Sequence, residues 1–100
     1  MTDENPENWR YFVSYTGVKL PVKLVNPLEI ADLNHRNTFI RATFDAEERL
    51  LGFEKMVYGE VEIWHRYEYD AAGVIRRAEI SMDGDVTEMR FDESGALVSA

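Results

Sequence analysis

The chain from residue 37 onward consists of short segments of alternating apolar and polar residues, separated by turns of two to five residues. In order, the segments and turns are TFIRATF, DAEER, LLGFEKMVY, Gly59-Glu60, VEIWHRYEY, DAAG, VIRRAEISM, a turn around Asp83-Gly84, VTEMRF, DESG and ALV. A period of two predicts strands, and connections this short leave no room for the crossover that parallel pairing requires. The pattern therefore predicts an antiparallel meander.

The region before residue 37 adds strands and one weak helical segment. Aromatic residues alternate with other residues from Trp9 to Tyr15, and VKLPVKLV follows with its apolar residues on one face. Pro21 cannot donate a ladder hydrogen bond, so its strand is expected at a sheet edge or at a bulge. Asn26-Pro27 is expected to end this strand, and residues 28–35 have the spacing of a short helix. The predicted fold class is mainly β: an antiparallel meander of about seven strands with at most one short helix.

Length and composition set the domain organisation. With 100 residues, 45% of them hydrophobic, the chain has the size and composition of one folded domain. Residues 1–8 are polar and lack apolar periodicity, so we expect a disordered tail at 1–8 and one β domain at 9–100. The chain has no cysteine, so its stability must come from packing.

Charge and motifs narrow the classes of partner. The 19 acidic and 11 basic residues give a net charge of -8, which repels phosphate backbones and anionic lipids and favours a basic protein partner. We therefore expect no nucleic-acid partner and no membrane partner. The polar start lacks the features of a signal peptide, which points to the cytoplasm. No phosphate-binding or nucleophile motif occurs and the two histidines, His35 and His65, are far apart, so we predict no cofactor, no metal and no catalytic residue.

A weak internal repeat accompanies three of the turns. An aromatic residue and an aspartate are followed by an aliphatic residue six positions after the aromatic one, at Phe44-Asp45 with Leu50, Tyr69-Asp70 with Ile75 and Phe91-Asp92 with Leu97. Four positions after the aromatic residue, two copies have a glycine, and the other has Glu48. The unit resembles the YD-type repeats of RHS-like proteins, which implies a β-hairpin for each copy. Hairpin turns select Asp and Gly on physical grounds, so the resemblance carries no function. The chain as a whole also resembles small bacterial families of uncharacterised domains.

Counting outward from the turns gives an expected register. A two-residue loop at Gly59-Glu60 places Tyr58 opposite Val61 and Glu54 opposite His65, and the next loop places His65 opposite Ala78. The expected core face collects Met56, Tyr58, Val61, Ile63, Tyr67, Tyr69, Val74, Ala78, Ile80, Met89 and Phe91. The expected charged face collects Lys55, Glu62, Trp64, Arg66, Glu68, Arg77, Glu79, Glu88 and Arg90, with Phe53 and Val57 among them.

An apolar sheet face must be covered. The segment 28–35 is too short to cover it alone. We therefore expect the sheet to curl into a half-barrel, to form a homodimer, or both.

His65 is the best candidate for site chemistry. On the expected register it lies near four polar or aromatic side chains, and the candidate ligand-binding residues are His65, Glu54, Tyr67, Tyr69 and Arg76. A carboxylate beside an imidazole can fix its tautomer and raise its pKa. The simpler interpretation is a half-buried histidine that a glutamate satisfies.

Two functions remain open. The favoured one is a non-enzymatic protein-interaction domain, with neutralisation of a basic partner as one form of it. The alternative is a small-molecule binding protein or enzyme with a pocket around His65.

Overall fold

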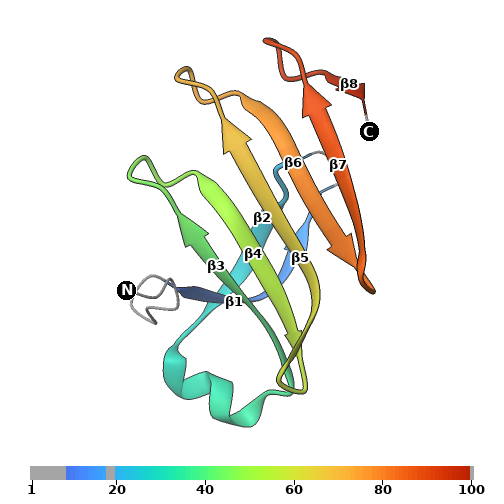
Figure 1. Cartoon of the computed structure of the whole chain (residues 1–100). Coiled ribbons are helices and arrows are strands. Elements are labelled where there is room, and N and C mark those ends of the chain that lie inside the picture. Colours follow the sequence, from blue (N-terminus) through green and yellow to red (C-terminus); the bar gives the residue numbers. More distant parts are fainter. Residues whose placement is uncertain (1–8, 18–19, 100) are drawn as a thin grey trace, which may run out of the picture.

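The computed structural model describes residues 9–17 and 20–99, so the expected tail at 1–8 lies outside the described residues. The described chain forms one antiparallel sheet of eight strands in the order β2-β1-β3-β4-β5-β6-β7-β8 (Figure 1). The elements are β1 (Arg10–Thr16), β2 (Lys23–Leu28), the 3-10 helix η2 (Ile30–His35), β3 (Thr38–Phe44), β4 (Leu50–Val57), β5 (Glu60–Tyr69), β6 (Ile75–Met82), β7 (Asp85–Phe91) and β8 (Leu97–Ser99). The predicted fold class, mainly β with antiparallel neighbours and one short helical segment, is confirmed.

The sheet is sequential from β3 to β8, whereas β1 lies between β2 and β3 at its start. β2 is consequently an edge strand. Asn26-Pro27 was expected to end a strand, but both residues lie inside β2, where Pro27 pairs with Phe12. An edge strand tolerates this because one side of its backbone has no neighbour that needs the missing N–H group.

The two ends of the sheet use different turns. The β4–β5 and β6–β7 loops are Tyr58-Gly59 and Asp83-Gly84, and all four residues have positive φ angles, which defines type I′ turns. At the other end, the loops that begin at Asp45, Asp70 and Asp92 share one geometry. In each, the aspartate Oδ1 accepts hydrogen bonds from the backbone N–H groups two and four residues later.

The fourth residue of each aspartate loop has a left-handed backbone. It is Gly73 or Gly95 in two loops and Glu48, with φ 66°, in the third. Its N–H group donates to the aspartate carbonyl oxygen in all three loops. The repeated sequence unit therefore corresponds to a repeated turn.

The expected register between β4 and β5 is wrong by one residue on β4. The loop begins at Tyr58 instead of Gly59, and a bulge follows between Lys55 and Met56, so Phe53 lies opposite His65 and Glu54 lies opposite Trp64. A shift of one residue exchanges the two faces of a strand. Phe53, which was expected among the charged residues, is therefore buried, whereas Tyr58 and Val61 are exposed. His65 pairs with Ile80 instead of Ala78, a shift of two residues that preserves its face.

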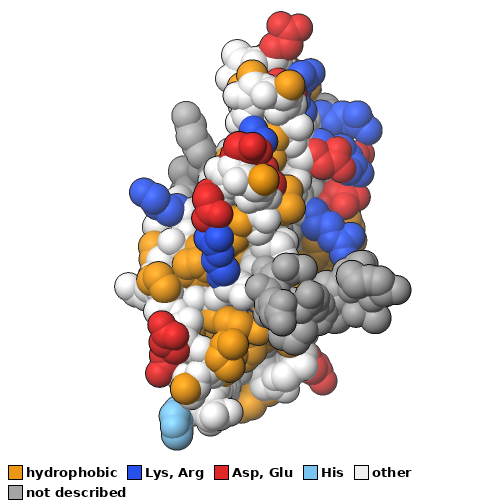
Figure 2. Space-filling view, turned by 90° about the vertical axis from the view of Figure 1, so that its left-hand side faces the viewer, with side chains coloured by type: hydrophobic (Ala, Val, Ile, Leu, Met, Phe, Trp, Pro, Cys, Tyr) orange, Lys and Arg blue, Asp and Glu red, His pale blue; other side chains and the backbone are white. Residues whose placement is uncertain are grey.

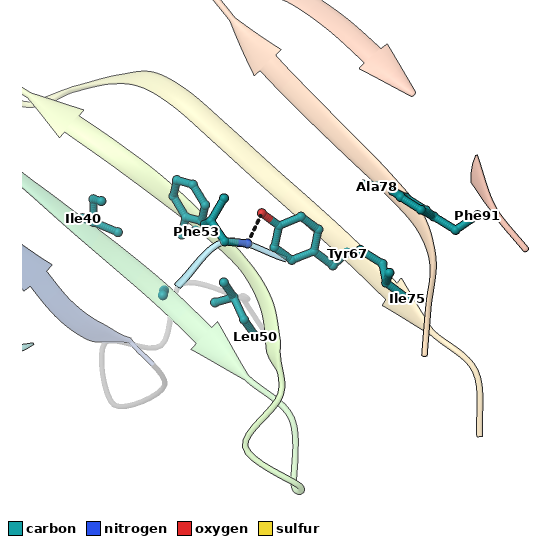
Figure 3. Close-up of a cluster of buried hydrophobic side chains, with 9 residues drawn as sticks. Ile40, Leu50, Phe53, Tyr67, Ile75, Ala78 and Phe91 are labelled. Atoms are coloured by element: carbon teal, nitrogen blue, oxygen red, sulfur yellow. Dashed lines mark hydrogen bonds between the residues drawn. The ribbon is translucent and has the colours of Figure 1, made fainter. Parts of the chain in front are cut away.

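The β1–β2 hairpin covers the apolar face of the sheet. It crosses behind the central strands in Figure 1, and Tyr15 of β1 packs on Phe53 of β4 with ring centroids 5.2 Å apart. Figure 3 shows the buried side chains of β3 to β7 on one face, with the Val22 N–H group bonded to the Tyr67 hydroxyl. Because Val22 contacts β5 although three strands separate β5 from β2 in the sheet, the sheet is curled. The helix η2 has no buried residue, so it contributes little cover.

Candidate functional site

The structure brings together only part of the predicted ligand-binding set. His65 and Tyr67 lie side by side, with Nδ1 and the hydroxyl oxygen 2.6 Å apart. Glu54 lies on the opposite face, where it pairs with Arg41. The Tyr69 hydroxyl donates to the carbonyl oxygen of Leu50.

Arg76 lies apart from His65 as well. Its Nε donates to the carbonyl oxygen of Phe91, and its guanidinium group lies 3.6 Å from Asp70. The five residues therefore do not converge on one point.

The His65 imidazole is enclosed by aromatic side chains. It is 7% exposed, its ring centroid lies 4.5 Å from that of Phe53, and Tyr15 and Tyr67 pack beside it. Burial lowers its pKa from 6.5 to about 4, so the ring is neutral near pH 7. Burial also raises the pKa of Tyr67, so its hydroxyl stays protonated. The Tyr67 hydroxyl also accepts a hydrogen bond from the N–H group of Val22, so a hydrogen-bonded chain joins the residue before β2 to β5.

The outer face of the sheet carries a ladder of ion pairs. Arg41 pairs with Glu54, and Arg77 reaches Glu68 at 2.8 Å and Glu79 at 2.9 Å and also contacts Glu88. The hydrogen bond to Glu88 raises the pKa of Arg77. Figure 2, which views one side of the molecule, shows side chains of both signs next to each other along part of the surface. Arg90 also pairs with Glu88, so the charged groups of the ladder that are named here all have a partner of opposite sign.

A groove of about 520 Å³ lies between the two type I′ turns, and we call it the turn-end groove. Among the residues that the structure describes, its lining includes three carboxylates and no basic residue. The residues are Val57, Glu60, Val61, Glu62, Trp64, Ser81, Asp83 and Gly84. Glu62 pairs with Lys55 at 3.3 Å, whereas Glu60 and Asp83 make no ion pair with any described residue. The groove therefore holds unbalanced negative charge.

Three exposed apolar side chains lie at the same end of the sheet as the turn-end groove, although they are not part of its lining. Tyr58 is 75% exposed, Val86 is 56% exposed and Met82 is 53% exposed. Met82 directly precedes the β6–β7 turn, and Val86 pairs with Ser81, which lines the groove. This end of the sheet thus combines acidic and apolar surface.

Tyr58 has an unusual backbone for its residue type. Its φ angle is 50°, in the left-handed region that bulky residues rarely adopt. The equivalent position of the other type I′ turn is Asp83, a residue type that suits such turns. Strained positions cluster at functional sites, and an exposed tyrosine here gains no packing in return.

A second groove, of about 510 Å³, lies on the outer face above Gly52, and we call it the Gly52 groove. Thr43 and Arg66 flank Gly52 in the register. The outer-face side chains that line the groove include Trp9, Leu51, Glu54, Trp64, Glu68 and Glu79. Gly52 itself is buried, because the carbonyl oxygen of His65 and the Arg66 side chain occupy the space that a Cβ atom at this position would take.

The turn-end groove was not predicted from the sequence. The residues around Asp83-Gly84 were predicted only as a turn, and Tyr58 was expected in the core. The available signal was the Tyr58-Gly59 pair, since a two-residue turn at this position forces tyrosine into a positive φ angle. Which residues line the grooves depends on which side chains face outward. The expected register was shifted, so it did not assign these side chains to the correct face.

These features define a small antiparallel β domain with a curled sheet, an enclosed histidine and two outer grooves. The model of DUF6156, a family of unknown function, matches residues 4–100, and the chain belongs to this family. No curated protein and no solved structure matches the chain. Within the described residues, no helix is both long and apolar enough to cross a membrane.

Proposed function

We propose that this chain is a non-enzymatic interaction domain that binds a basic segment of another protein at the turn-end groove. The observation that carries the proposal is a groove whose described lining has three carboxylates and no basic residue, at an end of the sheet that also carries exposed apolar side chains. Such a surface complements a segment that carries both lysine or arginine and apolar residues.

The distribution of charge favours this groove over the rest of the outer face. On the ladder, the four glutamates around Arg41 and Arg77 are all engaged in ion pairs with these two arginines. At the groove, Glu60 and Asp83 keep their charge available for a partner. The net charge of -8 adds long-range attraction for a basic protein, which raises the rate of encounter.

Tyr58 supplies the apolar contact of the proposed site. Tyrosine is enriched at the centre of protein interfaces because it buries a large area and loses little side-chain entropy. Its exposure and its left-handed backbone both fit a residue retained for contact. Neutralisation of a basic protein, by covering its cationic surface, is one form of the proposed function.

The alternative function needs space beside the His65 imidazole. Tyr15, Phe53 and Tyr67 pack around that ring, and the imidazole is almost entirely buried. This packing favours the interaction function over a ligand pocket. Our proposal also keeps the cytoplasm as the location of the protein and the aspartate loops as copies of a YD-type repeat.

The test is a calorimetric titration of the protein with a short synthetic peptide of alternating lysine and valine, at physiological ionic strength. Removing the charges of Glu60 and Asp83 in the double variant Glu60→Gln, Asp83→Asn should weaken binding by about three- to thirtyfold. Tyr58→Asn should also weaken binding, while the protein stays at least as stable because asparagine suits the turn.

Glu93→Gln is the matched control, because it removes an exposed charge from the β7–β8 loop at the other end of the sheet. It should leave the affinity nearly unchanged. The single variant Glu60→Gln gives the direct comparison. If Glu93→Gln and Glu60→Gln reduced the affinity equally, only net charge would matter, and the proposed groove would be rejected.

A further inference from the structure

Most of β7 has a backbone edge with no strand beside it. Within the described chain, β8 pairs with β7 only at Arg90 and Phe91, and Figure 1 shows β8 beside only that end of β7. Residues 85–89 therefore lack a strand neighbour on the side away from β6, and we call this part of β7 the free edge. No described side chain bonds to its backbone either, since Arg76 donates to Phe91, beyond it. The free edge is about 17 Å long, and its outward N–H and C=O groups can pair with another strand.

The opposite edge of the sheet has features that oppose such pairing. β2 begins at Lys23 and contains Pro27, which has no N–H group, and Asn26, whose φ angle of 60° departs from strand geometry. Proteins use lysine, proline and irregular backbone to keep sheet edges unpaired. The free edge of β7 has the sequence DVTEM, with no lysine, no proline and no positive φ angle, and Val86 and Thr87 are β-branched. Of the two edges, the free edge of β7 is the one suited to strand addition.

The charge near the free edge indicates the kind of strand that fits it. Residues 83–89 include three acidic residues and no basic one. Glu88 pairs with two arginines, whereas Asp83 and Asp85 make no ion pair with any described residue. A second copy of the chain would bring the same acidic segment to this edge, and like charges close together oppose pairing. A segment that contains lysine or arginine complements Asp83 and Asp85 instead.

The free edge also adjoins the turn-end groove. Val86 is 56% exposed and pairs with Ser81, which lines the groove, and Asp83 in the β6–β7 turn belongs to the same lining. Successive side chains of a strand point to opposite faces of a sheet. A strand added beside β7 can therefore pack an apolar side chain on Val86 and extend a basic side chain toward Asp83.

We propose that the basic partner segment adds to the sheet as an extended strand along the free edge of β7, with a basic side chain at Asp83 and Asp85. The inference rests on the proposed function, because Asp83 belongs to the turn-end groove. It adds the conformation of the bound segment and the backbone to which that segment binds. Affinity then comes partly from hydrogen bonds between main chains.

The test compares the peptide of alternating lysine and valine with a derivative that is N-methylated at every residue. N-methylation removes the backbone N–H donors and keeps the side chains and the charge. The derivative should bind about tenfold or more weakly. In the free protein, the amides of residues 85–89 that point away from β6 should exchange rapidly with solvent. The unmodified peptide, at about ten times its Kd, should slow this exchange about tenfold.

Val86→Lys is the variant that tests the position of the bound strand. It places a positive charge on the free edge and should weaken binding of the unmodified peptide by about three- to tenfold. Val98→Lys is the matched control, because Val98 lies on β8 outside the free edge and is 60% exposed. It should weaken binding by less than about twofold. Both valines are exposed, so neither substitution removes a core contact.

The outcomes separate this inference from the proposed function. Equal binding of the two peptides, with weaker binding by the Glu60→Gln, Asp83→Asn variant, would overturn strand addition and leave the proposed function in place. Unchanged exchange at residues 85–89 in the bound protein, or equal effects of Val86→Lys and Val98→Lys, would also overturn strand addition. No binding of the unmodified peptide would overturn both proposals.

Discussion

The buried His65 should make the stability of this protein fall at mildly acidic pH. The Val22 N–H group donates to the Tyr67 hydroxyl oxygen at 3.4 Å, which leaves the hydroxyl hydrogen for Nδ1 of His65 at 2.6 Å. This arrangement requires a neutral imidazole, because a protonated Nδ1 cannot accept a hydrogen bond. The groups that face His65 are aromatic or phenolic, and burial alone accounts for its lowered pKa.

The size of the effect follows from the two pKa values. His65 has a pKa of about 4 in the folded protein and 6.5 as its ordinary value. Below 6.5 the unfolded chain binds a proton that the folded protein does not, so the stability is fully present above 6.5 and falls as the pH approaches 4. The full loss is about 3 kcal/mol, and about 2 kcal/mol of it should occur between about pH 7.5 and about pH 5.

The assay is urea unfolding of the wild type and two variants across this pH range. His65→Gln cannot titrate but can still accept a hydrogen bond from Tyr67, so its stability should be nearly independent of pH there. His35→Gln changes the other histidine, which is exposed, and should keep the wild-type pH dependence. Carboxylates with lowered pKa values, such as Asp45, contribute mainly below about pH 4 and do not obscure the result.

A wild-type loss below about 0.5 kcal/mol over this range would refute the reasoning. Retention of the full pH dependence in His65→Gln would refute it as well, since the proton would then bind elsewhere.

Substitutions at three further positions, two of them with a control, test the backbone features of the fold by chemical unfolding. Gly84→Ala should cost about 1 kcal/mol through its positive φ angle alone, because a Cβ atom there meets nothing within 4 Å, and Gly84→Asn should cost less. Gly52→Ala should cost about 3 kcal/mol or more, because its Cβ atom would lie 2.5 Å from the carbonyl oxygen of His65, and amide exchange should rise along β4 and β5. Asp70→Ala should cost about 1 to 2 kcal/mol, because two backbone N–H groups lose their acceptor, whereas Asp85→Ala should change the stability by less than about half as much.

The hairpins were predictable because their turns carry local chemical signals. An aspartate followed by a glycine at the fourth position fits the loops at Asp70 and Asp92, and the structure forms both as expected. Alternation then identified the strands from β3 to β8. Pro21 was expected inside an edge strand, but it precedes β2; β2 is an edge strand, and the proline that it contains is Pro27.

The candidate site was not predictable to the same degree, because face assignment depends on register. Tyr58 enters the turn against the usual preference for asparagine or aspartate, and the bulge at Lys55 leaves no mark in the alternation. The turn that begins at Tyr58 and the bulge at Lys55 together place Glu54 and His65 on opposite faces of the sheet. The cover from the β1–β2 hairpin also depends on contacts between distant residues, which local patterns do not report.

The contact between Val22 and Tyr67 has a consequence for folding kinetics. These two residues are 45 positions apart, whereas each hairpin from β3 to β8 joins residues close in sequence. Closing a long loop is slow compared with forming a hairpin, so we expect β1 and β2 to dock after the later hairpins have paired. Substitutions in the β1–β2 hairpin should then mainly accelerate unfolding, and the first event in the loss of the native state should be the departure of this hairpin from the sheet.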